Sequence, residues 1–288
     1  MSIESLFAVP AALPVVPKVV QQLIQSFQRD DISIDEIASQ LAADPVLSAK
    51  TLRLANSAYF HVSRRIGSVD DALRMLGFVM VRNLVVGSGV AGAFKAVPGF
   101  DLPQFWRYSL HTACTARWLA NQRQLNTDLA FTVALVHGVG HLVMHAVEPA
   151  AMKALNQQVH PLAAGRAQAE QQALGYHNGE VSAELAQRWQ FPTEVVEALR
   201  RCPAPAQSQP LNQQAALVHV GAWRARIEAL KLDDQQAVAD CPVDVVKAMR
   251  MSLEWSPAMH TLVLDASSAA TPLPDLAELS AGLEAMFE

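Results

Sequence analysis

The chain has 288 residues, of which 51% are apolar and 17% are charged, so it can fill a sizeable core and lacks the composition of a disordered protein. Its net charge of −5 excludes a broad basic surface for nucleic acid. The three cysteines lie far apart in the sequence, which excludes a disulfide framework and a Cys-x-x-Cys zinc site.

The first predicted element is an amphipathic helix. Apolar side chains in residues 15–27 recur at the spacing of one helix face and alternate with glutamines. The next helix is predicted to begin at Ser33, because Ser33 and Glu36 form a capping box that satisfies free amide donors of the first turn.

Two more helix starts follow. Asp44 precedes Pro45, which combines an N-cap with a proline whose missing amide proton costs nothing in the first turn. Ser68 opens a further helix with apolar residues on one face, and Gly77 is its predicted stop.

Residues 87–92 read Gly-Ser-Gly-Val-Ala-Gly and match the dinucleotide-binding pattern G-x-G-x-x-G. That pattern binds a dinucleotide only between a strand and a helix, with an acidic residue about 20 positions later. No Asp or Glu occurs between residues 102 and 127, around the position of Trp106 where that residue is required. Small residues on a buried helix that permit close helix packing are the favoured interpretation.

Residues 129–147 contain no charged side chain but hold three histidines, His137, His141 and His145, at four-residue spacing. The length matches a membrane span of about 20 residues, yet the histidines, two glycines and the missing aromatic belt favour a buried core helix. The sequence therefore predicts no membrane segment.

The later chain is punctuated by prolines at 203, 205, 210, 272 and 274, which predict loops before a last helix from about Asp275. Residues 261–264 are the best candidate strand, and their period-two pattern is weak. The predicted fold class is all-α.

Two segments resemble the signature of HDOD domains, which are bacterial signalling output domains related to HD metal-dependent phosphohydrolases. They are DPVLSAKTLRLANSAYF at 44–60 and IGSVDDALRMLG at 66–77. The resemblance implies an HDOD domain over residues 1–205, with an N-terminal helical lobe at about 13–100 packed on an HD-like lobe at about 101–205. Residues 206–288 are predicted to be a C-terminal helical extension packed on the HD-like lobe.

HD enzymes hold metal with a distant His, a His-Asp doublet and a later Asp, because carboxylates bridge divalent ions and offset their charge. The resemblance places His111 at the distant His, His137-Gly138 at the doublet, His177 at a later His and Ala222 near the final Asp. Two carboxylates are therefore missing, and the pattern predicts a degenerate site with no catalytic residue, no bound metal and no cofactor.

The histidines leave one alternative open. A pair spaced by four residues on a helix can chelate zinc, although the helix rise separates His137 from His145 by about 12 Å. If a metal binds at all, the candidate ligands are His111, His137, His141 and His177. Neutral histidines hydrogen-bonded in a helix interface are the favoured interpretation.

The resemblance and the missing carboxylates together predict a non-catalytic signal-transduction module that acts through protein–protein contacts. An unidentified signalling protein is the expected partner, with a small ligand in the former HD cleft as an added option and no nucleic acid or membrane. The N-terminus lacks the basic region of a secretory signal, so a cytoplasmic location is expected. Two alternatives are a metal-dependent phosphodiesterase or nucleotide hydrolase with a histidine-only site, and a metal sensor built on His137 and His141.

Overall fold

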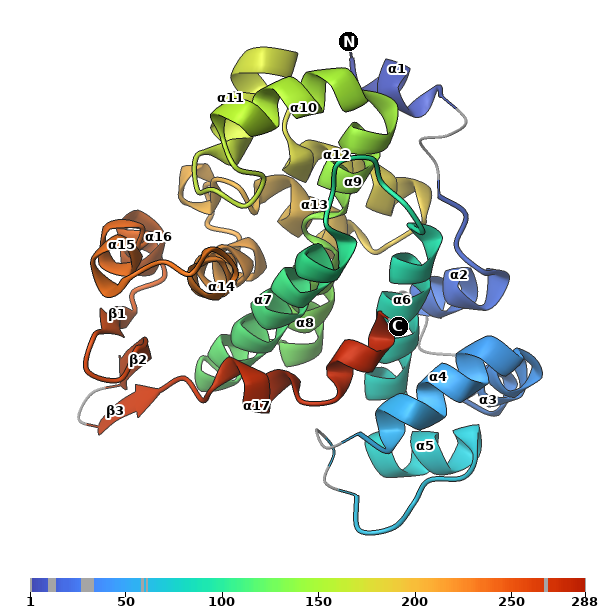
Figure 1. Ribbon diagram of the computed structural model, residues 1–288. Coiled ribbons are helices and arrows are strands. Elements are labelled where there is room, and N and C mark those ends of the chain that lie inside the picture. The colour runs from blue at the N-terminus through green and yellow to red at the C-terminus, as the bar shows by residue number, and fades with distance from the viewer. Residues whose placement is uncertain are drawn as a thin grey trace.

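Helices make up most of the computed structural model, and one small sheet lies near its carboxyl end (Figure 1). The structure describes residues 2–9, 14–26, 34–57, 60, 62–266 and 269–287. The predicted all-α class is confirmed, with the sheet as an addition. In chain order the helices up to the sheet are α1 (Ile3–Phe7), α2 (Lys18–Gln25), α3 (Ile34–Ala43), α4 (Pro45–Ala55), α5 (Val69–Leu76), α6 (Phe78–Ala93), α7 (Leu102–Gln122), α8 (Thr127–Val136), α9 (Val139–Val147), α10 (Pro149–Gln158), α11 (Arg166–Leu174), α12 (Asn178–Arg188), α13 (Thr193–Arg201), η4 (Pro205–Gln207), α14 (Gln213–Leu230), α15 (Asp234–Ala239) and α16 (Val243–Ala248).

Helices α2 to α6 form the N-terminal lobe, and two of their predicted starts are confirmed. Asp44 caps α4 by accepting from the amides of Val46 and Leu47, each at 3.0 Å. Ser68 caps α5, whose last turn ends at Gly77 with a φ of 80°, a value that favours glycine.

The first predicted helix begins later than its apolar pattern suggested. Val15 is 84% exposed and Val16 is buried, and both precede α2, which starts at Lys18 after Pro17. The proline accounts for the start, because it cannot donate within a helix and suits the helix boundary. Phe27 and the predicted cap Ser33 lie outside the described residues, although α3 does begin at Ile34.

The glycine-rich run at 87–92 lies in α6 and is buried from Gly87 to Ala91, as the close-packing interpretation predicted, whereas Gly92 is exposed. A Cβ atom on Gly89 would lie 2.4 Å from a methyl carbon of Val20, so glycine is what allows α6 to pack on α2.

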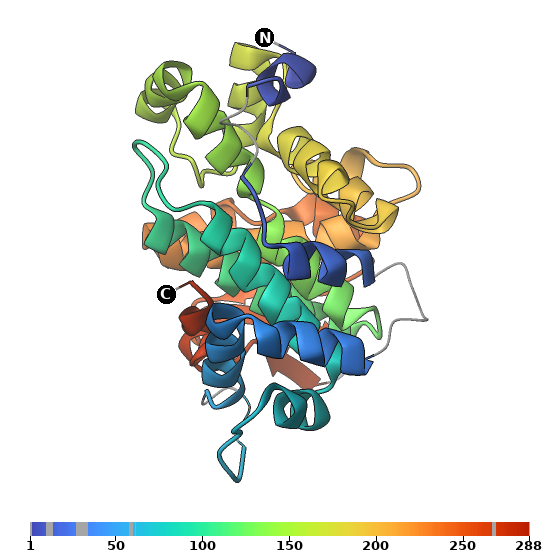
Figure 2. The ribbon, with the colours of Figure 1, turned by 90° about the vertical axis from the view of Figure 1, so that its right-hand side faces the viewer.

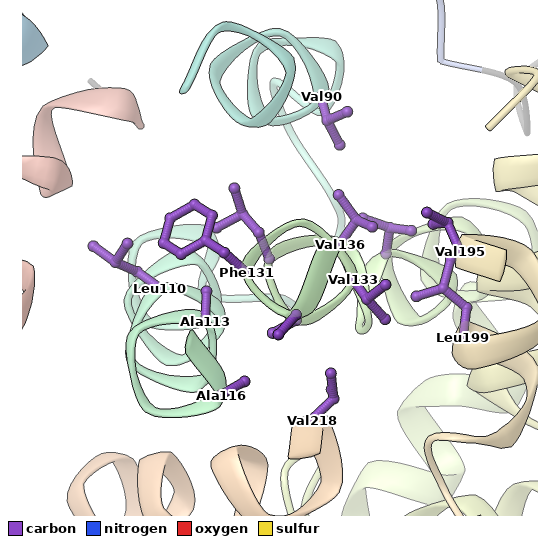
Figure 3. Close-up of a cluster of buried hydrophobic side chains, with 14 of the residues drawn as sticks. Val90, Leu110, Ala113, Ala116, Phe131, Val133, Val136, Val195, Leu199 and Val218 are labelled. Atoms are coloured by element: carbon purple, nitrogen blue, oxygen red, sulfur yellow. The ribbon is translucent and has the colours of Figure 1, made fainter. Parts of the chain in front are cut away.

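Helices α7 to α14 form the HD-like lobe, and α8 lies at its centre. Figure 3 shows side chains of α8, including Phe131 and Val136, surrounded by residues of α6, α7, α13 and α14. Helix α7 packs most extensively on α14 and α8. At the crossing of α14 and α7, a Cβ atom on Gly221 would lie 2.7 Å from the carbonyl oxygen of Thr112, so the two helices touch backbone to backbone.

The apolar segment Thr127–Val147 has the length and apolarity of a membrane span, but 83% of its apolar window is buried inside the protein. That burial identifies it as core. The prediction of one continuous helix is wrong, because α8 ends at Val136 and α9 begins at Val139. His137 therefore lies in the turn between the two helices and does not share a helix face with His141 and His145.

The N-terminal helix α1 packs on the HD-like lobe and not on the lobe that follows it in sequence (Figure 2). The guanidinium of Arg188 in α12 lies 4.8 Å from the ring centre of Phe7.

The segment after residue 205 is less separate and less helical than predicted. Helix α14 belongs to the core of the HD-like lobe. The chain then forms an antiparallel sheet in the order β1-β2-β3, with Leu253 and Trp255 buried on one face. Finally, it returns across α7 to reach α4 and α6 of the N-terminal lobe, so the carboxyl end bridges both lobes (Figure 1). These last elements are β1 (Ser252–Ser256), β2 (Thr261–Ala266), β3 (Ala269–Pro272), α17 (Leu276–Ser280) and η5 (Leu283–Met286).

Candidate functional site

The turn between α8 and α9 is held by α12. The Ser182 hydroxyl accepts from the Gly140 amide at 2.8 Å and donates to the His137 carbonyl oxygen at 2.9 Å. A Cβ atom on Gly140 would lie 2.1 Å from the Asn178 carbonyl oxygen, so only glycine permits this approach. These contacts hold the backbone of residues 137–140 against the start of α12.

Gly138, which the resemblance places at the lost aspartate, faces an aromatic side chain. A Cβ atom there would lie 2.9 Å from Cε2 of Phe105. The Phe105 ring is itself held between Phe100 and Trp106, at centroid distances of 5.4 and 4.9 Å. The space that a carboxylate at 138 would need is occupied by this ring.

A cavity of about 80 Å³ opens beside the turn. It combines imidazole, guanidinium, amide and apolar groups, and its lining contains no Asp or Glu among the described residues. Ala222, aligned near the lost final aspartate, forms part of the wall. The chemically distinctive lining residues are Tyr108, His137, His141, Arg166, Asn178, Cys202, His219 and Arg226.

A buried charged cluster supports one side of this cavity. Glu170 is fully buried, and its Oε1 lies 2.9 Å from Arg166 Nε and 3.1 Å from His141 Nδ1. Its Oε2 accepts from the amide and from Nδ2 of Asn178, each at 2.8 Å. Burial raises the pKa of Glu170, but His141 and the hydrogen bonds from Arg166 and Asn178 outweigh it and lower the pKa to about 2. The carboxylate therefore stays ionised and orients three cavity residues.

Two cavity histidines are neutral at pH 7. Burial lowers the pKa of His137 to about 4, and burial also lowers the pKa of His219. In each ring Nδ1 faces a carbonyl oxygen, that of Ala134 at 2.5 Å and that of Cys202 at 2.8 Å. Since a carbonyl can only accept, Nδ1 carries the proton and Nε2 keeps a lone pair.

The structure does not bring the four candidate ligands together. His137 and His141 line the cavity, but His111 and His177 do not. His111 is buried on α7, where the charges that act on it include Glu228 of α14. His177 caps α12, with its Nδ1 accepting from the Glu180 amide at 3.3 Å.

The metal of HD enzymes does not fit this donor set. Gly138 and Ala222 supply no carboxylate, and His141 is engaged by Glu170. In the part of the chain that the structure describes, no three His, Cys, Asp or Glu side chains converge as ligands would.

Six of the chemically distinctive cavity residues were not predicted from the sequence: Tyr108, Arg166, Asn178, Cys202, His219 and Arg226. Arg166 and Glu170 stand four residues apart, a spacing that a solvated surface pair also shows, so the pattern alone gives no sign of burial. Tyr108 takes the cavity position on α7 that His111 was expected to hold, with its ring 5.5 Å from that of His137.

The HDOD domain model matches residues 13–205, which is more than half of the chain. The chain belongs to the HDOD domain family. This confirms the resemblance seen in the two signature segments and relates the protein to the HD phosphohydrolases.

Solved structures share the fold. A Shewanella amazonensis SB2B protein with the provisional name phosphohydrolase is 26% identical, with a TM-score of 0.72 over 99% of this chain and 96% of the other. A Geobacter sulfurreducens HDOD domain protein of unknown function is 22% identical, with a TM-score of 0.66 over 86% and 94%. A Marinobacter aquaeolei VT8 protein with the provisional name signal transduction protein is 25% identical, with a TM-score of 0.62 over 83% and 57%.

Among curated proteins, an uncharacterized protein of Treponema pallidum (strain Nichols) is 23% identical over 220 residues. The match covers 72% of this chain but only 42% of that protein.

Proposed function

We propose that this HDOD protein is a non-catalytic signal-transduction module of the cytoplasm that acts through contacts with a partner protein. The observation that carries the proposal is the state of the two carboxylate positions of the HD site. Gly138 is backed by the Phe105 ring and Ala222 offers a methyl group, so neither position can neutralise or bridge divalent metal ions.

The names of two structural neighbours suggest different functions, since one is called a phosphohydrolase and the other a signal transduction protein. At 25–26% identity the chemistry of this chain depends on its own residues. Those residues form a cavity whose nearest buried carboxylate, Glu170, lies behind the lining and is engaged by its own partners, which supports a structural or ligand-binding role over a hydrolytic one.

The main alternative is a metal-dependent phosphodiesterase with a histidine-only site. His137 and His219 each keep one lone pair for a metal, which makes two imidazole ligands in the cavity. The second alternative, a metal sensor on His137 and His141, requires His141 to leave Glu170. That would break contacts of a buried carboxylate, which is costly.

The deciding experiment measures metal content and turnover on the purified full chain. We expect Fe, Mn and Zn well below one equivalent by elemental analysis, and no hydrolysis of bis(p-nitrophenyl) phosphate with added Mn²⁺ or Fe²⁺. Stoichiometric metal with turnover would overturn the non-catalytic proposal. Loss of that turnover in His137→Gln would then assign it to this cavity.

Partner capture uses the same full chain, since α14 is part of the core and truncation at residue 205 would remove it. Crosslinking in the native cells followed by mass spectrometry should return a defined protein. Recovery of nucleic acid in its place would contradict the expected partner class.

A further inference from the structure

Arg166 has a donor that the protein does not use. Its side chain is 2% exposed, with Nε bound to Glu170 and Nη1 bound to the carbonyl oxygen of Val159 at 2.7 Å. Nη2 is buried and has no hydrogen-bond partner among the described residues. An unpaired buried donor costs about 1–3 kcal/mol, and more when it is charged. Because Arg166 lines the cavity, a molecule bound there is a candidate partner for Nη2.

The same cavity offers two acceptors. His137 and His219 both line it, and the binding of each Nδ1 to a backbone carbonyl leaves Nε2 with a free lone pair. An occupant that pairs with Arg166 and with one of the two imidazoles must accept a hydrogen bond from the guanidinium and donate one to that imidazole.

The remaining charges around the cavity are already paired. Glu170 is engaged by Arg166, His141 and Asn178, and Arg226 Nε donates to Asp240 Oδ2 at 2.7 Å. No carboxylate lines the cavity within the described residues, so nothing there repels an anion. The cavity volume of about 80 Å³ is well above the roughly 10–15 Å³ that a single water needs, so the cavity has room for an occupant larger than one water molecule.

We propose that this cavity binds a phosphate group that retains a proton, either inorganic phosphate or the terminal group of a phosphomonoester. An ionised oxygen accepts from Arg166 Nη2, and the P–OH group donates to Nε2 of His137 or His219. Sulfate is fully deprotonated at neutral pH and would face these two lone pairs with no proton to share. The inference rests on the proposed non-catalytic function, because phosphate is held without metal and no bond is broken.

The test is a titration of the full chain with inorganic phosphate in buffer containing EDTA, by calorimetry and thermal melting at constant ionic strength. We expect saturable binding of phosphate and at least about tenfold weaker binding of sulfate, a difference of about 1.4 kcal/mol. Equal binding of the two ions, or no saturable binding of phosphate, would overturn the proposal and leave water as the occupant.

Two variants locate the binding. Ala222→Leu fills the cavity from a partly exposed wall position without touching the charged cluster, and phosphate affinity should fall at least about tenfold. Ala93→Leu, at a partly exposed position of α6 that does not line the cavity, is the control and should bind phosphate normally. Unchanged binding by Ala222→Leu would place phosphate elsewhere and contradict the proposal.

Arg166→Lys keeps a positive charge beside Glu170 but has one nitrogen in place of three and so cannot reproduce Nη2, and it should also lose phosphate affinity. If this variant does not fold, the phosphate affinity of Ala222→Leu still tests whether phosphate binds in the cavity. Failure of phosphate binding and failure of the proposed function give different results. The first is absence of saturation in EDTA, and the second is metal-dependent turnover of a phosphodiester.

Discussion

The two lobes treat polar groups differently. In the N-terminal lobe, the capping side chains Asp44 and Ser68 lie at helix starts and remain in contact with water. In the HD-like lobe, charged side chains also lie in the interior. All the buried charged side chains among the described residues, Arg166, Glu170, Arg224 and Arg226, belong to α11 and α14.

This difference separates groups that shape a helix from groups that shape a cavity. A cap satisfies amides that water could also satisfy, so its contribution to stability is modest. A buried carboxylate such as Glu170 has no such substitute, because every one of its hydrogen bonds must come from the protein. The HD-like lobe, whose interior contains desolvated charges, is the lobe that holds the candidate site.

The largest effect is expected from Glu170→Gln. The change leaves the Arg166 guanidinium buried beside a neutral amide, and breaking a buried ion pair in this way costs roughly 3–5 kcal/mol. Chemical denaturation measures the loss. Glu184→Gln is the matched control, since Glu184 pairs with Arg188 at the same four-residue spacing with both side chains partly exposed. The control should lose under about 0.5 kcal/mol. Equal losses would show that burial does not distinguish the two pairs.

Gly138→Asp should destabilise by about 1–3 kcal/mol and should not create a hydrolase. The sequence alone predicts the loss from an unpaired carboxylate in an apolar cleft, whereas the structure shows that the first obstacle is the Phe105 ring. The double variant Gly138→Asp/Phe105→Leu should therefore recover part of the loss in thermal melting. Turnover of a phosphodiester by the single variant would show that the site is intact. If the stability losses of the two single variants simply add in the double variant, the Phe105 ring is not what opposes an aspartate at position 138.

Acid should destabilise the HD-like lobe through its histidines. Burial lowers the pKa of His137 and of His145 to about 4 in the folded protein, while the unfolded chain binds these protons near pH 6.5. Stability is therefore full above pH 6.5 and falls as the pH drops toward 4, at about 1.4 kcal/mol per pH unit for each histidine. The depressed pKa of Glu170 adds a further loss below about pH 4.5, as the pH falls toward 2.

Denaturant midpoints between pH 7.5 and 4.5 measure this slope. His137→Gln should flatten it, and the exposed His260→Gln should leave it unchanged. A slope that His137→Gln does not alter would mean that His137 is protonated in the folded protein.

The parts of the fold that sequence predicts are those with a local cause. Asp44, Ser68 and Gly77 act on amides within a few residues, so their pattern is sufficient to place α4 and α5. The sheet was largely missed for the converse reason. In β1 the alternation of Leu253 and Trp255 with polar neighbours spans only five residues, and its meaning depends on pairing with β2.

The candidate site divides in the same way. The missing carboxylates at Gly138 and Ala222 are visible in the sequence once the family is recognised. The cluster of Arg166, Glu170 and Asn178 is not, because its chemistry comes from the docking of α11 and α12 against α9. His111 was misplaced because the orientation of α7, which turns Tyr108 into the cavity, is set by packing on α8 and α14.

The smallest effect is expected in the N-terminal lobe, from Asp44→Ala. The variant removes an acceptor shared by the amides of Val46 and Leu47, both at 3.0 Å, and should cost about 1 kcal/mol. Asp44→Asn keeps an oxygen acceptor at the same place and should remain within about 0.5 kcal/mol of wild type. The contrast between the lobes is tested by comparing the denaturant midpoints of these two variants with those of Glu170→Gln and Glu184→Gln. A loss at Asp44 as large as that at Glu170 would break it, because a water-exposed cap would then be worth as much as a buried ion pair.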